Sequence, residues 1–228
     1  MTQALLLAVV TAMLLSGVAH AQDTGSLIRR APAQIPTGSG SDAERARRAT
    51  AAFAECLVDR SRGRVEKYLA SFPGTAEARD IGRKLADSDC LSSGGLKFQE
   101  QVMRALFYQI LYNKTFRDKE LPDFSTVPPL DYSAGAPVGV ASNEIALRNF
   151  ADCVTRANPS DARTLTLSNT ASDGEKRAFD AMMPSFSACL PQDRTIEFSK
   201  TILKGLVAET LYRLSTAAAS PSATGSAI

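Results

Sequence analysis

Four cysteines are the residues of this chain whose type and spacing point most directly to chemistry: Cys56, Cys90, Cys153 and Cys189. Thiolates that act in redox or metal sites commonly come as a Cys-x-x-Cys pair or beside other metal ligands. The chain has no Cys-x-x-Cys motif, and no second metal ligand clusters near the four thiols. We therefore expect disulfides rather than a redox or metal centre, and no cofactor.

Paired carboxylates are a second arrangement that can catalyse a reaction, because two of them cleave glycosidic bonds without histidine. Glu100, Glu197 and Glu209 lie on or near the most apolar helical segments, and Glu209 stands where the first half of the chain has Gln109. Most acidic residues are surface charges, and sequence spacing pairs none of these three. The chain has no Ser-x-x-Lys, Gly-x-Ser-x-Gly, P-loop or dinucleotide-binding motif.

Arginines gather in two short stretches, which hold Arg45, Arg47 and Arg48, and then Arg60, Arg62 and Arg64. Such a cluster is a candidate patch for binding an anion, such as a lipid headgroup or a cell-wall polymer. Aromatic residues do not alternate with these arginines, and Glu44 and Arg48 have the i, i+4 spacing of an ordinary helix pair. The sequence therefore favours a solvated helix face over an anion-binding patch.

Two apolar pairs, Met182-Met183 and Phe107-Tyr108, are candidates for lining a groove that takes an apolar ligand or a helix. Their helical spacing is also that of core residues, and core packing is the interpretation that this spacing favours.

The first 21 residues read as an export signal. Residues 4–19 form an uncharged apolar run that ends in Ala19-His20-Ala21, which has the small residues of a signal peptidase site. An N-terminal membrane anchor is the alternative, but the run is short for a span and a cleavage pattern follows it. We predict cleavage after Ala21 and a periplasmic or secreted protein. No later run is apolar enough to cross a bilayer, so we do not expect a transmembrane protein after cleavage.

Composition excludes several chemistries. The single histidine of the 228 residues, His20, lies in the segment predicted to be removed, which excludes Ser-His-Asp catalysis and histidine-ligated metals from the mature chain. The net charge is only +2, with 26 basic and 24 acidic residues, so there is no electrostatic reason to expect a nucleic acid partner.

A repeat organises the rest of the chain. Phe53-Ala-Glu-Cys56 recurs as Phe150-Ala-Asp-Cys153, an offset of 97 residues, and Cys90-Leu91 recurs as Cys189-Leu190. Leu106, Leu111 and Tyr112 recur at an offset of 100 residues, as Leu206, Leu211 and Tyr212. We predict two homologous units, 41–114 and 142–214, joined by a proline-rich connector at 115–141, with disordered tails at 22–40 and 215–228.

The repeat favours one disulfide pairing, in which Cys56 bonds to Cys90 and Cys153 bonds to Cys189. The alternative of Cys56 with Cys153 and Cys90 with Cys189 also respects the repeat. Small exported domains commonly carry internal disulfides, which favours the pairing within each unit.

Apolar periodicity predicts an all-α fold of about four helices per unit. Ser41-x-x-Glu44 and Ser172-x-x-Glu175 have the pattern of capping boxes, and Asn158-Pro159 is a helix start. Pro184 is expected to kink or shorten its helix. The fourth helix of each unit is apolar on much of its circumference, so we expect these two helices to join the units into one pseudo-symmetric body.

The repeated pattern Phe-x-x-Cys, Cys-Leu and Leu-Tyr resembles that of exported alphaproteobacterial proteins to which no activity is assigned. The resemblance covers most of the chain beyond the signal. It implies an envelope location, and it implies no activity and no functional residue.

The leading functional hypothesis is a non-enzymatic periplasmic or secreted binding protein that acts through a groove between the units or through the arginine-rich face. Its expected partner is an envelope protein, a cell-wall polymer or a small apolar ligand. The alternatives are a histidine-free envelope hydrolase that uses paired carboxylates, and a stress-related holdase with exposed apolar surface.

Overall fold

The computed structural model describes residues 27–29, 39–85, 90, 95–97, 99–138, 142–190 and 199–220. The predicted signal peptide with His20, the candidate carboxylate Glu197 and the last eight residues of the predicted C-terminal tail lie outside the described residues. No helix within the described ranges is long and apolar enough to span a membrane.

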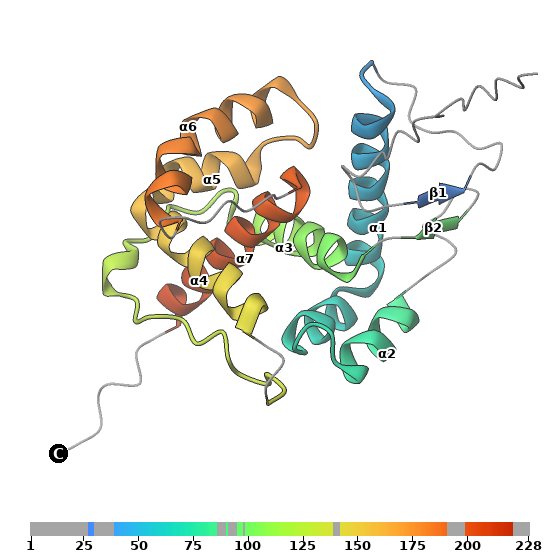
Figure 1. Ribbon diagram of the computed structural model, residues 1–228, viewed down its shortest axis with the longest axis horizontal. Helices are drawn as coiled ribbons and strands as arrows, with labels where there is room; N and C mark the ends of the chain where they lie inside the picture. Colours follow the sequence, from blue (N-terminus) through green and yellow to red (C-terminus); the bar gives the residue numbers. More distant parts are fainter. Residues whose placement is uncertain are drawn as a thin grey trace, which may run out of the picture.

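The all-α fold class is confirmed, since the described residues form seven α-helices and one short antiparallel pair of strands (Figure 1). The helices are α1 (Asp42–Ala70), α2 (Ala76–Leu85), α3 (Glu100–Phe116), α4 (Ser142–Ala157), α5 (Pro159–Leu167), α6 (Asp173–Cys189) and α7 (Lys200–Ala219). The strands are β1 (Leu27–Arg29) and β2 (Gly95–Lys97), with Ile28 opposite Leu96.

Two segments differ from the expected tails. Strand β1 falls within 22–40, and α7 continues past Leu214 to Ala219. Three-residue strands are too short to show an alternating pattern, and an Ala-rich stretch extends a helix at little cost because alanine has the highest helix propensity.

Local capping explains where several helices begin. Ser41 and Glu44 form the predicted capping box at the start of α1. Ser172 accepts a hydrogen bond from the Glu175 N–H at the start of α6, and the Asn158 side chain accepts one from the Asp161 N–H before Pro159 begins α5. Each cap satisfies a backbone donor that has no partner within the helix.

The first two expected helices of the N-terminal half are joined in α1. The helix runs on from 42 to 70, but Ser61 is non-helical, with φ −144° and ψ 39°. Asn158, at an offset of 97, separates α4 from α5 with φ −146° and ψ 77°. A proline follows Asn158 whereas Arg62 follows Ser61, so only the second break is evident from the sequence.

Pro184 does not end α6, which contrasts with the expectation of a shortened helix. The helix continues for five residues beyond the proline to Cys189. The last turns are held by the burial of Phe186 and by the disulfide at Cys189, which compensate for the hydrogen bond that proline cannot donate.

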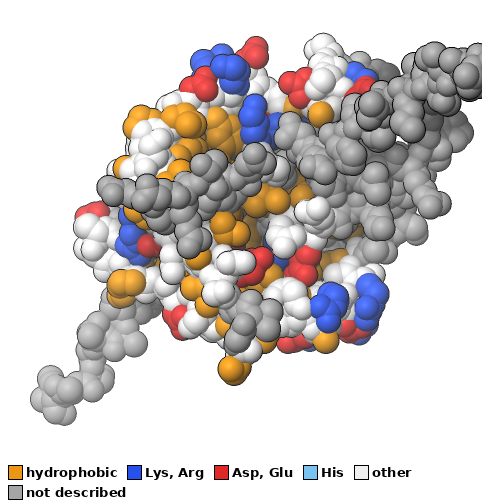
Figure 2. Space-filling model, in the orientation of Figure 1, with side chains coloured by type: hydrophobic (Ala, Val, Ile, Leu, Met, Phe, Trp, Pro, Cys, Tyr) orange, Lys and Arg blue, Asp and Glu red, His pale blue; other side chains and the backbone are white. Residues whose placement is uncertain are grey.

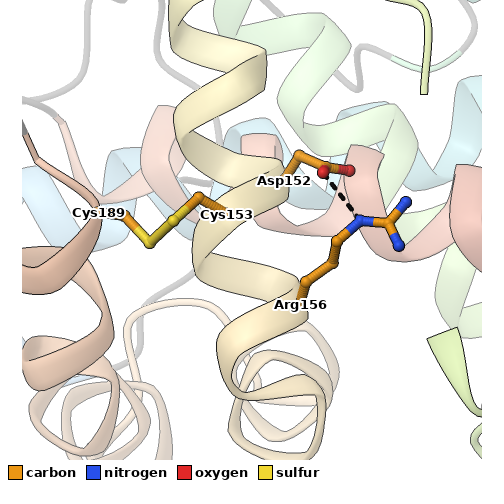
Figure 3. Close-up of a disulfide and its surroundings, with 4 residues drawn as sticks. All are labelled: Asp152, Cys153, Arg156 and Cys189. Atoms are coloured by element: carbon orange, nitrogen blue, oxygen red, sulfur yellow. Dashed lines mark hydrogen bonds and ion pairs between the residues drawn. A yellow bond between two sulfur atoms is a disulfide. The ribbon is translucent and has the colours of Figure 1, made fainter. Parts of the chain in front are cut away.

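The predicted disulfide pairing is confirmed. Cys56 of α1 bonds to Cys90, with 5.7 Å between their Cα atoms, and Cys153 of α4 bonds to Cys189 at the end of α6, with 5.9 Å. Figure 3 shows the second bond joining α4 to α6, while Asp152 and Arg156 point away from it. Each bond closes a loop of more than 30 residues, which in the chain-entropy model contributes roughly 4 kcal/mol.

The connector between the halves is held by Arg156 of α4. Its Nε donates to Asp152, and its terminal nitrogens donate to the carbonyls of Phe124, Val127 and Pro128 at 2.9–3.0 Å. These contacts fix the 3-10 turn η2 (Phe124–Thr126), and the Phe124 side chain is buried.

Helices α3 and α7 correspond to the fourth helices that the sequence predicted for the two units. They lie at the centre of the molecule and pack closely on each other, as expected (Figure 1). One apolar cluster packs α1, α2 and α3 together, and a second packs α4 to α7 with the end of α3. Tyr212 of α7 packs against both clusters, which makes the core continuous.

Gly205 determines how closely the central helices approach. A Cβ atom built at Gly205 would overlap the Cβ and Cα of Ala105 and lie 3.0 Å from its carbonyl carbon. The clash is with the backbone of α3, which cannot move aside as a flexible side chain can.

We predict that Gly205→Ala lowers the free energy of unfolding by about 3 kcal/mol, because the added methyl overpacks the crossing. The matched control is Gly63→Ala in α1, where no atom lies within 4 Å of the new Cβ. That change should raise the unfolding free energy by about 0.5–1 kcal/mol through helix propensity. Urea denaturation of both variants measures the difference, and equal stabilities would contradict the proposed role of the crossing.

Candidate functional site

Two buried cationic side chains, Arg104 and Lys204, hold the ends of neighbouring helices in place. Arg104 of α3 donates to the carbonyls of Tyr68, Leu69 and Ser71 at the end of α1, at 2.8–3.0 Å. Lys204 of α7 donates from Nζ to the Ser168 carbonyl at the end of α5, at 2.7 Å. Each cation therefore neutralises the carbonyl groups at a helix C-terminus, where unpaired acceptors carry partial negative charge.

Lys204 also belongs to an ion network that connects the two halves. Its Nζ lies 3.1 Å from Glu175 Oε1, and Arg47 of α1 reaches the other oxygen of Glu175 at 2.8 Å. Burial alone would raise the pKa of Glu175, but the charges of Lys204 and Arg47 lower it overall. Arg47 is thus a structural residue that holds α1 against α6.

Sequence reasoning did not single out Arg104, Lys204 or Glu175 as buried residues. The one available signal is that Arg104 and Lys204 occupy the same place on the two fourth helices, one hundred residues apart. A cation that recurs on a helix with an otherwise apolar surface points to a buried partner.

Glu209, the candidate acid on α7, is engaged in a second buried network. Its carboxylate lies 3.0 Å from Arg148 Nε and 2.8 Å from Arg213 Nη2. Burial lowers the pKa of Arg148, but the charges of Glu209 and Glu144 raise it overall, so this guanidinium stays charged. Two guanidinium groups therefore hold this one carboxylate, which makes Glu209 the centre of a buried ion-pair network.

Glu100 and Glu209 lie in different surroundings. Glu100 lines a pocket between α1, α2 and α3, where both its oxygens accept from the Gly74 N–H at 3.2 Å and one lies 3.8 Å from Arg104. Glu209 lies beside the α3–α7 crossing. Glu197 lies outside the described residues, so the structure brings together no carboxylate pair from the three candidates.

The arginine patch is divided between two places on α1. Arg45 pairs with Asp42, and Arg48 donates to the carbonyls of Ser39 and Ala171. Arg62 pairs with Glu66 at 2.8 Å and Arg64 donates to the Lys84 carbonyl at 3.0 Å, while Arg60 lies one residue before the break at Ser61. These arginines therefore contact nearby carboxylates and the carbonyls of neighbouring segments, and binding of an anion by this patch stays a prediction.

An apolar pocket of about 320 Å³ lies between α1, α2 and α3. Its walls are mainly apolar and aromatic side chains, namely Phe53, Leu57, Tyr68, Ala78, Leu85, Met103 and Phe107. Arg79, Gly82 and Arg83 line it from α2, and Gln99 and Glu100 line it from the start of α3. Small-molecule sites have this size and this mixture of an apolar wall with a few polar groups.

A larger crevice of about 700 Å³ lies between α1, the second half of α3 and the loop that joins α5 to α6. Its lining is mainly polar and includes Arg48, Glu55, Asn113, Lys114 and Asn169. The Thr166 hydroxyl, which also lines it, is buried and has no hydrogen-bond partner among the described residues. The crevice thus lies between helices of the first half and a loop of the second, and a binding groove between two homologous units stays a prediction.

The methionine and aromatic candidates take three different roles. Phe107 lines the apolar pocket, and Tyr108 accepts a hydrogen bond from Arg213 within the core. Met182 is fully buried and Met183 is 53% exposed. Phe107, Tyr108 and Met182 are therefore core residues, and of the four candidates only Phe107 lines the apolar pocket.

Comparisons with protein-family models, with curated proteins and with solved structures find no match to this chain. Across the described ranges, no group of three or more histidine, cysteine or acidic residues is arranged to hold a metal ion. The functional proposal therefore rests on the apolar pocket, the polar crevice and the side chains that line them.

We predict that Glu209→Gln lowers the free energy of unfolding by about 3 kcal/mol, because it removes the buried countercharge of Arg148 and leaves that guanidinium only the partly exposed Glu144. The control is Asp80→Asn on α2, where an exposed carboxylate pairs with Lys84 at 2.7 Å. Breaking that surface pair should cost less than about 1 kcal/mol. Thermal or urea unfolding of both variants compares the two losses, and a Glu209→Gln protein as stable as the wild type would contradict the structural role of this carboxylate.

Proposed function

We propose that this protein is an exported, non-enzymatic binding protein that takes a small ligand with an apolar body into the α1–α2–α3 pocket. The predicted signal segment and the two disulfides support a periplasmic or secreted location, because such bonds persist in oxidising compartments. The apolar pocket supports the binding function.

The observation that carries this proposal is that the equivalent space in the second half is filled. Thr75 and Ser172 cap α2 and α6 at an offset of 97, and the same offset places Phe179 where α2 has Gly82. Phe179 is 8% exposed within the second apolar cluster, and Phe186, in the last turns of α6, stacks on Phe150.

The comparison of the two halves rests on the predicted duplication, which several local features support. The breaks at Ser61 and Asn158, the helix ends at Ser71 and Ser168, and the caps at Thr75 and Ser172 all keep the same offset. We propose that the chain arose from two copies of one helical unit and that only the first copy keeps an open pocket.

A binding function accounts for the arrangement better than the alternatives do. The hydrolase hypothesis needs a carboxylate free to donate a proton, and Glu209 is held by two arginines. The holdase hypothesis needs extended exposed apolar surface, and Val138 and Met183 are the large exposed apolar side chains among the described residues.

A second candidate function, binding of a cell-wall polymer, is favoured by one observation. The buried Thr166 hydroxyl lines the polar crevice and lacks a protein partner, and such a group gains a hydrogen bond when a polar ligand enters. Amide and charged side chains around it suit the hydroxyl and amide groups of a cell-wall fragment.

We predict that the full chain binds the neutral fluorescent probe N-phenyl-1-naphthylamine and that Gly82→Leu weakens this binding at least about tenfold by occupying the pocket. The new Cβ would lie 3.3 Å from Cε2 of Tyr68, so that ring must shift slightly. Filling an apolar cavity should also raise the unfolding free energy by about 0.5–2 kcal/mol.

The matched control is Gly63→Leu, which makes the same change at an exposed helical position with open space around it. It should leave probe affinity unchanged. The proposal fails if the wild-type chain does not bind the probe, or if Gly82→Leu binds it as well as the wild type does.

A further inference from the structure

We propose that the ligand of the α1–α2–α3 pocket is an anionic amphiphile, whose apolar body occupies the pocket while Arg79 and Arg83 hold its negatively charged head group. This inference rests on the proposed binding function and adds the chemical class of the ligand.

The two arginines stand at the edge of the apolar wall. They lie one helical turn apart on α2, both line the pocket, and both are exposed residues, so their charged ends reach water while the wall beside them is apolar. Basic side chains gather over α2 on the face shown at the lower right of Figure 2. Gly82 lies beside Arg83 and carries no side chain that would separate a head group from the helix.

The present partners of these arginines leave them able to bind an anion. Arg79 donates to the Gly74 carbonyl, which is neutral. Arg83 lies 3.2 Å from Asp80, but that exposed carboxylate lies closer to Lys84, at 2.7 Å. Exposed pairs of this kind are worth less than about 1 kcal/mol, so a head group can replace Asp80 at little cost.

The spacing of Arg79 and Arg83 does not by itself stabilise α2. Two cations at i and i+4 repel each other and weaken a helix. At an offset of 97 the second half carries Lys176 and Asp180, which form an ion pair of 2.9 Å beside a filled core. The half with the open pocket thus has two positive charges where the half with the filled core has an attractive pair.

The acidic residue that lines the pocket does not oppose this charge. Both oxygens of Glu100 accept from the Gly74 N–H, and one of them lies 3.8 Å from the buried Arg104, which carries a countercharge. The uncompensated charge at the mouth is therefore positive, which favours a carboxylate, sulfonate or phosphate on the ligand.

Two probes that differ only in a sulfonate test the inference. We expect 8-anilinonaphthalene-1-sulfonate to bind the full-length chain more tightly than N-phenyl-1-naphthylamine, its neutral counterpart. The double variant Arg79→Gln/Arg83→Gln should weaken binding of the sulfonated probe about tenfold or more, because charge-assisted hydrogen bonds are lost. Binding of the neutral probe should change less than about twofold.

The control is Arg62→Gln/Lys176→Gln, which removes the same charge from two exposed side chains that do not line the pocket. It should leave both affinities unchanged. Competition by dodecanoate and by dodecyl phosphate then distinguishes a carboxylate from a phosphate head group, and displacement by either supports the inference.

Equal affinity of the wild type for the two probes would overturn the anionic class while leaving the proposed pocket intact. The same conclusion follows if the arginine variant loses both probes equally, or if the control variant loses the sulfonated probe to the same extent. Binding of neither probe would instead overturn the proposed function itself.

Discussion

The contact between Ala105 and Gly205 is the constraint on which the rest of the structure depends. Because Gly205 has no side chain, α7 can lie against the backbone of α3, and both helices then present the remainder of their apolar surfaces outward. The first half packs on one side of this pair and the second half on the other (Figure 1). Van der Waals contact at this crossing thus fixes how the two halves lie against each other, and with that the polar crevice between them.

Helices α3 and α7 are buried along much of their lengths, so the charged side chains buried on them are paired with groups of other helices or of the same helix. Arg104 and Lys204 each bind carbonyl groups at the end of a neighbouring helix. Glu175 balances one cation from each half, and Glu209 balances two cations of the second half. Removal of one member leaves another charge buried without a partner, which costs more than the pair contributes. These residues therefore specify which helix ends may pack against the central pair.

The same architecture has different consequences in the two halves. Phe179 and Phe186 fill the core of the second half, whereas Gly82 borders an apolar pocket in the first. A well-packed core stabilises a fold and an open apolar cavity does not, so the two halves contribute differently to stability. The arginine pair at the open pocket adds a charge preference that packing alone does not explain.

The sequence by itself determined the helical periodicity and the caps at Ser41, Asn158 and Ser172, and its recurring pattern favoured the disulfide pairing that the structure has. These features depend on neighbours within a few residues or on two copies of one pattern. Only the tertiary structure decided that Arg104 and Lys204 are buried, that Glu209 is an ion-pair residue, and that Gly82 borders an open pocket. The physical reason is that the burial of a charge, or an empty space, depends on which distant helices surround a residue, and no local periodicity records those distances.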